Sequence, residues 1–237
     1  MTASPTLRAE GARMYEELLA VHTVMRRGAA LVCESFARLV DGEPVDARAL
    51  VATSRWLIEF VHRHHAGEDV LFWPVLRDLF PDSVAEIDEL TIEHQALDAE
   101  LHALARALDA IATPEGVGPH PASLVIVGQA ALYGLPSAQR VQAILIKQFD
   151  EEEPVLLELF PRVPDRDILR LRKSIVQGVT RTSPHLVLGL LEDPDRTPAY
   201  AEMVSHFPAA LRWTRPVLLA RYRSIKKALG VSTPTRL

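Results

Sequence analysis

The sequence predicts an all-helical protein whose larger part is an up-down-up-down four-helix bundle. Good helix formers, mainly Ala, Leu, Arg and Glu, dominate the composition, and aromatic residues make up only 6% of the chain. Four long segments repeat apolar residues with the 3.6-residue period of amphipathic helices. Short connections between such segments favour antiparallel neighbours, which is the connectivity of an up-down-up-down bundle.

The first two predicted helices occupy the N-terminal third of the chain. One runs from about Glu10 to Val40 and ends at the turn Asp41-Gly42. The next runs from about Asp46 to Phe80. Pro74 should kink this helix or begin its last turn, because proline has no amide hydrogen to donate within a helix.

The third and fourth predicted helices are separated by a loop rich in proline and glycine, Thr113 to Pro121. The third helix begins after Pro81 and continues to about Ile111. Ser83 followed three residues later by Glu86 is typical of a capping box at its start.

The fourth helix is clearest from about Ser137 to Phe160, with Pro154 as a predicted kink. The preceding stretch, Ala122 to Leu135, is either a further part of this helix or a short separate helix. Its glycines, Gly128 and Gly134, favour neither alternative.

The residues after Arg162 show a weaker helical period, and Pro208 and Pro216 interrupt the last segment. We expect a bundle of residues 1–162 and a helical C-terminal extension, residues 163–237, packed on it. The segments of the extension that look helical are Asp165–Val179, His185–Leu191 and Tyr200–Leu229.

The net charge of −5 argues against a general nucleic-acid binder, and no specific nucleic-acid partner is expected, but the charges are unevenly distributed. No Asp or Glu follows Glu202. This basic tail either packs on the acidic bundle, is solvated, or makes a weak contact with an anionic surface. The basic residues beyond Glu202 are Arg212, Arg215, Arg221, Arg223, Lys226, Lys227 and Arg236.

Two features favour a cytoplasmic protein. Cys33 is the single cysteine, so the chain forms no internal disulfide, as expected in a reducing compartment. The N-terminus lacks the basic and apolar regions of a signal peptide. The longest apolar stretch, Ala122 to Leu135, is too short to be a transmembrane segment.

One polar side chain interrupts the apolar stripe of each predicted helix. Residues three, four and seven positions apart share a helix face, and apolar residues such as Leu18 and Met25 occupy these positions around His22. Each helix therefore directs one polar group into the bundle. The four residues are His22, His64, His94 and Gln148.

Three carboxylates follow these residues at a spacing of four: Glu68 after His64, Asp98 after His94 and Glu152 after Gln148. Burying an unpaired carboxylate is costly, and such groups persist where they are paired or bind a metal. A single histidine in an apolar stripe is more often a hydrogen-bonded core residue. Four coincident positions instead indicate a metal site in the bundle, and mixed nitrogen and oxygen ligands suit iron, manganese or zinc.

The residues around these positions resemble the hemerythrin-like (HHE cation-binding) domain family. HHAGEDVLFWP, residues 64–74, is similar to the second-helix H-x-x-x-E motif of the family with its following aromatic-Pro. IEHQALD (92–98) resembles the third-helix motif, KQFDEEE (147–153) the fourth, and residues 19–26 the first. The resemblance covers about residues 10–162 and is most specific in the second helix.

The resemblance implies a carboxylate-bridged pair of non-haem iron ions that handles a small ligand such as dioxygen, nitric oxide or peroxide. By position in the motifs, His22, His64 and His94 would be nitrogen ligands, and Glu68 and Glu152 the bridging carboxylates. His65 is one residue out of register with the motif and is expected at the surface or beside the ligands.

Two departures from the family pattern concern the ligand set. Gln148 stands where the family usually has a histidine, and Asp98 where oxygen carriers have a second histidine of the third helix. One iron position is then under-coordinated, open or empty. Alternatively the site is rich in carboxylates, with Asp98, Glu152 and Glu153 contributing, which suits oxidation chemistry more than reversible oxygen carriage.

Three functions remain open from the sequence. The first is a di-iron protein that senses or scavenges dioxygen, nitric oxide or peroxide. The second is a di-iron oxidase or oxygenase with an organic substrate; if the chain is an enzyme, we expect such an oxidoreductase. The third is a metal-depleted helical interaction module. Trp56, Trp73 and Trp213 are expected to serve packing rather than recognition.

Overall fold

The structure is a computed structural model that describes residues 5–113, 121–164, 166–172 and 183–231. Every regular element in these ranges is a helix, which confirms the predicted all-helical class. Most of the predicted loop between the third and fourth helices and residues 173–179 of a predicted later helix lie outside the described residues.

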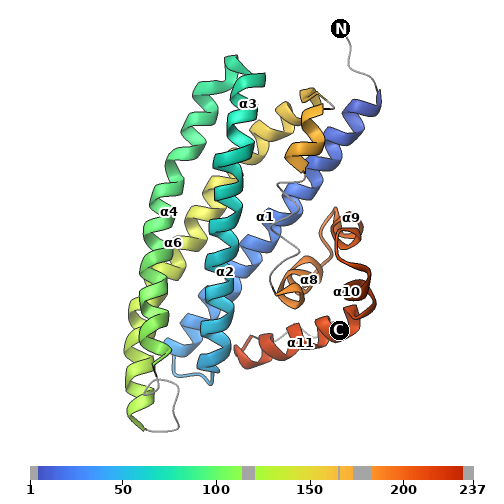
Figure 1. The fold of residues 1–237 in the computed structure, drawn as a ribbon. Coiled ribbons are helices and arrows are strands. Elements are labelled where there is room, and N and C mark those ends of the chain that lie inside the picture. Colours follow the sequence, from blue (N-terminus) through green and yellow to red (C-terminus); the bar gives the residue numbers. More distant parts are fainter. Residues whose placement is uncertain (1–4, 114–120, 165, 173–182, 232–237) are drawn as a thin grey trace.

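Four long helices lie side by side and enclose the main core (Figure 1). The helix α1 contacts α2 and α6, and α4 also contacts α2 and α6, so the contacts form a closed ring. The four helices are α1 (Pro5–Val40), α2 (Ala47–Gly67), α4 (Val84–Ile111) and α6 (Pro121–Leu159).

The inner face of α4 shows how the sequence pattern produces this packing. Apolar side chains recur along it at alternating spacings of three and four, so they form one stripe on the helix. The stripe is buried and belongs to the main hydrophobic core. His94 occupies one position of the same repeat, which places a polar ring inside the core. The buried apolar members are Ile87, Leu90, Leu97, Leu101, Leu104, Leu108 and Ile111.

The starts of α2 and α4 are formed in different ways. The side chain of Asp46 accepts a hydrogen bond from the Ala49 amide at 2.8 Å, which satisfies one free donor at the start of α2. The predicted capping box at Ser83 is wrong, because Ser83 makes no side-chain cap bond. Residues Pro81–Ser83 form a 3-10 turn, η2, that runs directly into α4 and leaves no abrupt helix end at Ser83.

The predicted second helix is divided in three by a change in helix type. After α2 comes a π-helical turn, η1 (Glu68–Phe72), and then α3 (Trp73–Leu79) with Pro74 in its first turn. The Trp73 amide donates to the Glu68 carbonyl, five residues back. The π-helical turn is wider than an α-helical turn and changes which residues face inward. Phe72 and Trp73 are therefore buried in the core, while Leu71 is exposed. Single π turns inside α-helices are frequent at functional sites.

The predicted fourth helix is longer than its clearest pattern indicated. The helix α6 is continuous through Pro136 and Pro154, so the stretch 122–135 is part of it rather than a separate helix. Each proline lacks the amide donor for one helical bond. A 3-10 turn, η3 (Phe160–Arg162), follows α6 and contacts α1.

The described part of the C-terminal region lies against α1 (Figure 1). The helix α8 is buried almost all round between α1 and α11, as expected of a helix that is apolar on every side. Gly189 allows this contact, since a β-carbon there would lie 2.1 Å from the Tyr222 ring. The helices of the C-terminal region are α8 (Pro184–Glu192), α9 (Tyr200–Ser205), α10 (Ala209–Trp213) and α11 (Arg215–Ala228), and a helical segment at 166–172 precedes them.

A buried carboxylate joins α1 to the C-terminal region. Glu17 is fully buried, and the Arg172 guanidinium donates to both of its oxygens at 2.7 Å. The Nε2 atom of His206 lies 2.9 Å from the same carboxylate. Two groups from the C-terminal region therefore offset the cost of burying this charge.

The variant Arg172→Ala is expected to lower the free energy of unfolding by about 3 kcal/mol, because it leaves Glu17 buried without its principal partner. Urea denaturation would measure the change. The control is Arg166→Ala, which removes an exposed arginine paired only with neighbouring Asp167 and should change stability by less than about 0.5 kcal/mol. Equal effects of the two variants would contradict the importance of the buried pair.

Candidate metal centre

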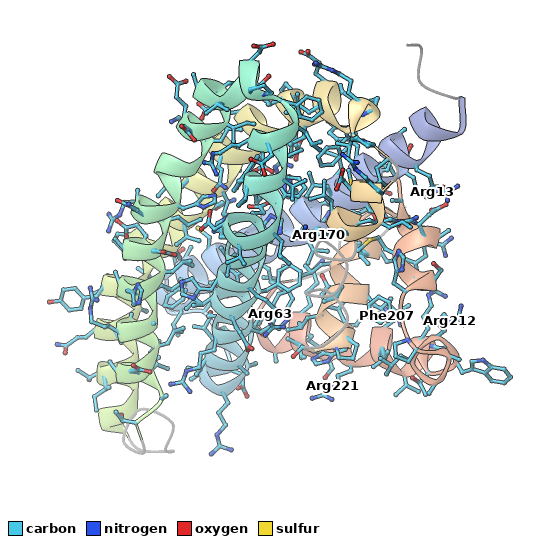
Figure 2. All side chains as sticks on the ribbon, turned by 45° about the horizontal axis from the view of Figure 1, so that its top comes forward. Arg13, Arg63, Arg170, Phe207, Arg212 and Arg221 are labelled. Atoms are coloured by element: carbon cyan, nitrogen blue, oxygen red, sulfur yellow. The ribbon has the colours of Figure 1, made fainter. Side chains whose placement is uncertain are left out.

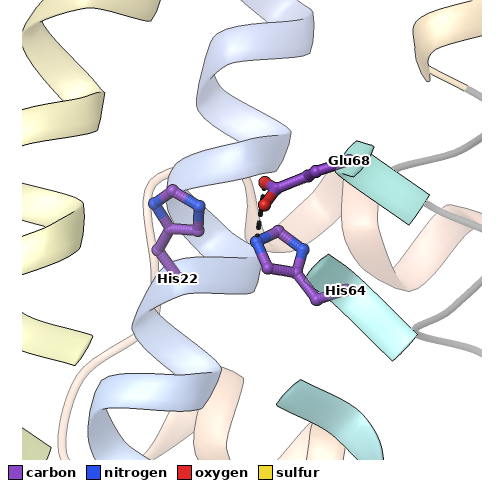
Figure 3. A group of neighbouring side chains, drawn as sticks. All are labelled: His22, His64 and Glu68. Carbon is purple, nitrogen blue, oxygen red and sulfur yellow. Dashed lines mark ion pairs between the residues drawn. The ribbon is translucent and has the colours of Figure 1, made fainter. Parts of the chain in front are cut away.

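Seven polar side chains meet in the core between the four long helices, and each is buried or nearly so. The helix α1 contributes one, the last turn of α2 two, and η1, α4 and α6 the others. Figure 3 shows three of them, with the His22 ring facing the pair formed by His64 and Glu68. The seven are His22, His64, His65, Glu68, His94, Gln148 and Glu152.

The side chains form two overlapping groups with the spacing of metal ligands. One ligand atom each from His22, His64 and Glu68 lies within 4.8 Å of the others. The same holds for His65, Glu68 and His94. Glu68 belongs to both groups, so a single carboxylate lies between two three-residue sets.

Helix geometry explains why Glu68 is shared. Each residue of an α-helix is rotated by about 100° from the one before it, so His65 points about 100° away from His64. Glu68, four residues after His64 and three after His65, points between these directions, about 40° from one and 60° from the other. The adjacent histidines can therefore face different groups, while the glutamate reaches both.

The His22 ring is held on two sides. It stacks on Phe149 with ring centroids 3.9 Å apart, and its Nδ1 lies 2.9 Å from Glu153 Oε1. The opposite ring nitrogen, Nε2, faces the centre, 3.7 Å from Glu152 Oε1. Metal-binding histidines commonly use their second nitrogen in this way, which orients the ring and selects the tautomer.

Glu153 is itself held by an arginine. Arg26 donates to Glu153 at 2.6 Å and to Asp150 at 2.9 Å. Burial alone would raise the pKa of the Glu153 carboxyl, but the hydrogen bonds from His22 and Arg26 outweigh it and lower this pKa. Glu153, which the carboxylate-rich alternative offered as a ligand, is thus an ionised partner of His22 in this structure.

Burial decides the protonation of the central side chains. Desolvation lowers the pKa of His22 and of His64 to about 3, so both rings are neutral near pH 7 and retain a lone pair for a metal. Desolvation also raises the pKa of Glu68 and of Glu152 well above the usual range. Without a cation, the pocket disfavours the charge of both glutamates.

The central atoms also lack hydrogen-bond partners, although nearly all buried polar groups in proteins have one. His64 Nε2 lies 2.9 Å from Glu68 Oε1, but the two atoms form no hydrogen bond with each other. A cation between the lone pairs would satisfy them, so the residues present fit a metal ion. The atoms without partners are His22 Nε2, His64 Nε2, His65 Nδ1, Gln148 Oε1 and both carboxylate oxygens of Glu68 and Glu152. His94 Nδ1 lies 3.2 Å from Asp69 Oδ1.

Gln148 lies beside the second group. Its Nε2 is 3.3 Å from His65 Nε2 and 3.0 Å from His94 Nε2, and these two rings stack at 4.2 Å. When the amide donates to both neutral rings, each ring carries its proton on Nδ1, so a metal would have to take the Nε2 lone pairs in place of the amide. The amide oxygen has no hydrogen-bond partner. An amide oxygen is a neutral and weaker ligand than imidazole, so the two groups differ in the donors available to a metal.

Two sequence predictions need correction. Asp98 does not reach the centre: its side chain is 51% exposed and lies 3.4 Å from His62 Nε2 at the surface. The interior stripe of α4 passes through Leu97 and Leu101, and Asp98 is rotated away from it.

His65 is the residue that sequence reasoning missed. It was expected beside the ligands or at the surface, but it is buried and belongs to the second group. The signal was present in the His64-His65-x-x-Glu68 spacing, because Glu68 is one turn from both histidines. The structure brings together the other expected ligands: His22, His64, Glu68, His94 and Glu152, with Gln148 beside them.

Comparison with known proteins supports the same interpretation. The model of the hemerythrin HHE cation-binding domain matches residues 13–162. Searches of curated proteins and of solved structures found no match. The matched range contains all four long helices apart from the first residues of α1, and every residue of both groups. Because this match spans more than half of the chain, the protein belongs to the hemerythrin HHE cation-binding domain family.

Proposed function

We propose that this cation-binding protein holds two non-haem iron ions and handles dioxygen, nitric oxide or peroxide. The observation that supports a pair of ions is the position of Glu68 in both ligand groups. A carboxylate offers two oxygens, so it can serve one ion on each side. The proposal includes an up-down-up-down arrangement of α1, α2, α4 and α6, which supplies inward-facing ligands from all four helices.

The ligand set follows from the two groups. His22, His64 and Glu68 would hold one ion, and His65, His94 and Glu68 the other. Glu152, which faces His22, would complete the centre as a second bridging carboxylate. Iron supplies redox chemistry toward small oxygen- and nitrogen-containing molecules when bound.

The residues around the proposed ligands keep the histidine ligands neutral and correctly oriented for a metal. Burial excludes bulk water and keeps His22 and His64 neutral. The Arg26–Glu153 pair holds the His22 ring so that Nε2 points inward. Preorganised ligands lower the cost of rearrangement when the metal binds.

A second candidate function is a di-iron oxidase or oxygenase that acts on an organic substrate. Gln148 favours it, because a neutral amide in place of a histidine leaves one ion with a weaker donor and room for a further ligand. Turnover of an organic compound with consumption of dioxygen would distinguish this enzyme from a sensor or scavenger.

Among the described residues, no helix is both long and apolar enough to cross a bilayer. A cytoplasmic location remains a prediction, as does the division into residues 1–162 and 163–237.

The decisive experiment is metal analysis of protein produced with iron, combined with its optical spectrum. The wild-type protein should contain about two iron ions per chain and absorb as a non-haem iron protein. His65→Gln should lose about half of the iron, because only one group contains His65. The matched control is His62→Gln, a partly exposed histidine three residues away that belongs to neither group.

Three outcomes would contradict parts of this proposal. A colourless, metal-free wild-type protein would favour the interaction-module alternative. Full iron content in His65→Gln would remove His65 from the ligand set. Loss of iron in the His62→Gln control would show that the effect is not specific to the buried histidine.

A further inference from the structure

The outer face of α10 and α11 combines exposed aromatic and apolar side chains with unpaired positive charges. We propose that this face, called here the basic-aromatic face, docks on membranes that contain anionic phospholipid. It is separate from the metal centre and does not depend on it. The face consists of Arg212, Trp213, Pro216, Val217, Ala220, Arg221, Arg223, Ser224 and Lys227.

The helix periodicity separates this face from the one that packs on the protein. Leu219, Tyr222 and Lys226 of α11 are buried toward α8 and its following turn. Val217 and Arg221, four residues apart, lie on the exposed side with Ala220, Ser224 and Lys227. In Figure 2, Arg212 and Arg221 lie on the outer side of the C-terminal helices.

The charges on this face have no ion-pair partners among the residues that the structure describes. Arg215 and Lys226 are paired with Glu192 and Asp193, respectively. Within the described part of the chain, no ion pair involves the exposed cations Arg212, Arg221, Arg223 and Lys227. The absence of any Asp or Glu after residue 202 explains this excess, because no carboxylate is available along either helix.

Trp213 is the apolar anchor of the face. The expectation that all three tryptophans serve packing is wrong for this residue: it is 86% exposed, whereas Trp56 and Trp73 are buried. Val217, one turn further, is 68% exposed. Trp213 and Val217 are neighbours on this face, so the cations adjoin an apolar pair rather than a single scattered apolar residue.

An anionic membrane surface fits both features of the face. Lipid phosphates attract the guanidinium and ammonium groups, and the headgroup region accommodates the amphipathic indole ring. A helix with exposed cations and a tryptophan can lie in the plane of such a surface. A protein partner would usually enclose an exposed tryptophan in a packed interface core. Apart from Trp213 and Val217, this face is mostly charged or small and offers few further apolar anchors.

Tryptophan fluorescence tests this proposal on the full chain. Vesicles of phosphatidylcholine with phosphatidylglycerol should shift Trp213 emission to shorter wavelength and expose it to quenching by brominated lipid chains. Vesicles of phosphatidylcholine alone should not. The readout is specific, since the other two tryptophans are buried. Added salt should weaken binding, because it screens the attraction.

The discriminating variant is Arg221→Glu/Lys227→Glu, which should lower the vesicle partition coefficient at least about 25-fold, given about fivefold for each lost cation. The matched control is Arg106→Glu/Arg166→Glu, which makes the same change in net charge at two exposed residues outside the face. Trp213→Phe should abolish the spectral shift while retaining salt-sensitive binding measured by vesicle sedimentation.

Several results would overturn the proposal. One is no binding of wild-type protein to the anionic vesicles. Another is an equal loss of binding in the control variant, which would indicate attraction through net charge alone. A third is binding to poly-glutamate without binding to vesicles, which would assign the face to an acidic polypeptide instead.

Discussion

Glu68→Ala is expected to remove most of the bound metal from both ligand groups, a larger loss than any single histidine substitution causes. Glu68 is the one residue common to the two groups, and it begins the π-helical turn that follows the paired histidines. Its removal takes away the carboxylate that we propose as a bridge and leaves each group with two histidines. Elemental analysis and the optical spectrum of the purified variant would measure the loss.

A matched control for this change is Glu59→Ala. Glu59 is an exposed glutamate of α2 that pairs with Arg63, and its removal should leave the metal content unchanged. Near-wild-type metal in Glu68→Ala would refute Glu68 as a ligand. Loss of metal together with loss of helical circular dichroism would instead indicate unfolding, so both properties need to be recorded.

Glu152→Gln is expected to change stability in opposite directions with and without metal. In the metal-free protein, burial and, after it, the nearby Glu68 carboxylate raise the pKa of the fully buried Glu152 carboxyl well above its usual range. Folding near pH 7 must therefore either bury the Glu152 charge or take up a proton, and a neutral amide of the same shape avoids both costs, so the free energy of unfolding should rise by about 1–3 kcal/mol.

With metal present, the same substitution removes the carboxylate that we propose as a second bridging ligand. Binding to the native state stabilises a protein in proportion to the logarithm of ligand concentration over dissociation constant, so weaker binding reduces that gain. Denaturation of the wild-type protein and of Glu152→Gln, with added iron and with a chelator, would show whether the change in the free energy of unfolding reverses its sign. The control is Glu151→Gln, which changes an exposed neighbouring glutamate paired with Lys147. It should change the free energy of unfolding by less than about 0.5 kcal/mol, with or without iron. A destabilised metal-free Glu152→Gln would show that the carboxylate has a structural partner.

Without a bound cation, the polar cluster in the core lowers the stability of the fold. Four histidines are kept neutral and two glutamates are kept from water among apolar helices. A sequence selected for stability alone would place apolar residues at such positions. Retention of this polar cluster in the core is therefore a sign of function.

The sequence alone determined the helices and the helix faces that carry the polar cluster. Apolar repeats at spacings of three and four predict which side of each helix is buried, and His22, His94 and Glu152 follow that repeat. The sequence motif for a helix cap failed at Ser83, because residues Pro81–Ser83 form a 3-10 turn that continues directly into α4. Asp98 shows a related error: a spacing of four places it about 40° round the helix from His94, and on α4 this direction leads away from the buried stripe of Leu97 and Leu101.

Only the tertiary structure decided how the second helix presents its ligands and what the last helices leave exposed. A sequence repeat assumes one helix type, so it could not show the π-helical turn that begins at Glu68. The sequence places Glu68 one turn from both His64 and His65, but it could not show that the His65 ring stacks on His94 of α4. Nor could it show that Trp213 lies in solvent, because an isolated tryptophan carries no information about which partner covers it. The environments of His65 and Trp213 depend on which distant segments pack against them, and the hydrophobic pattern of one segment shows only that a face is buried, not what lies against it.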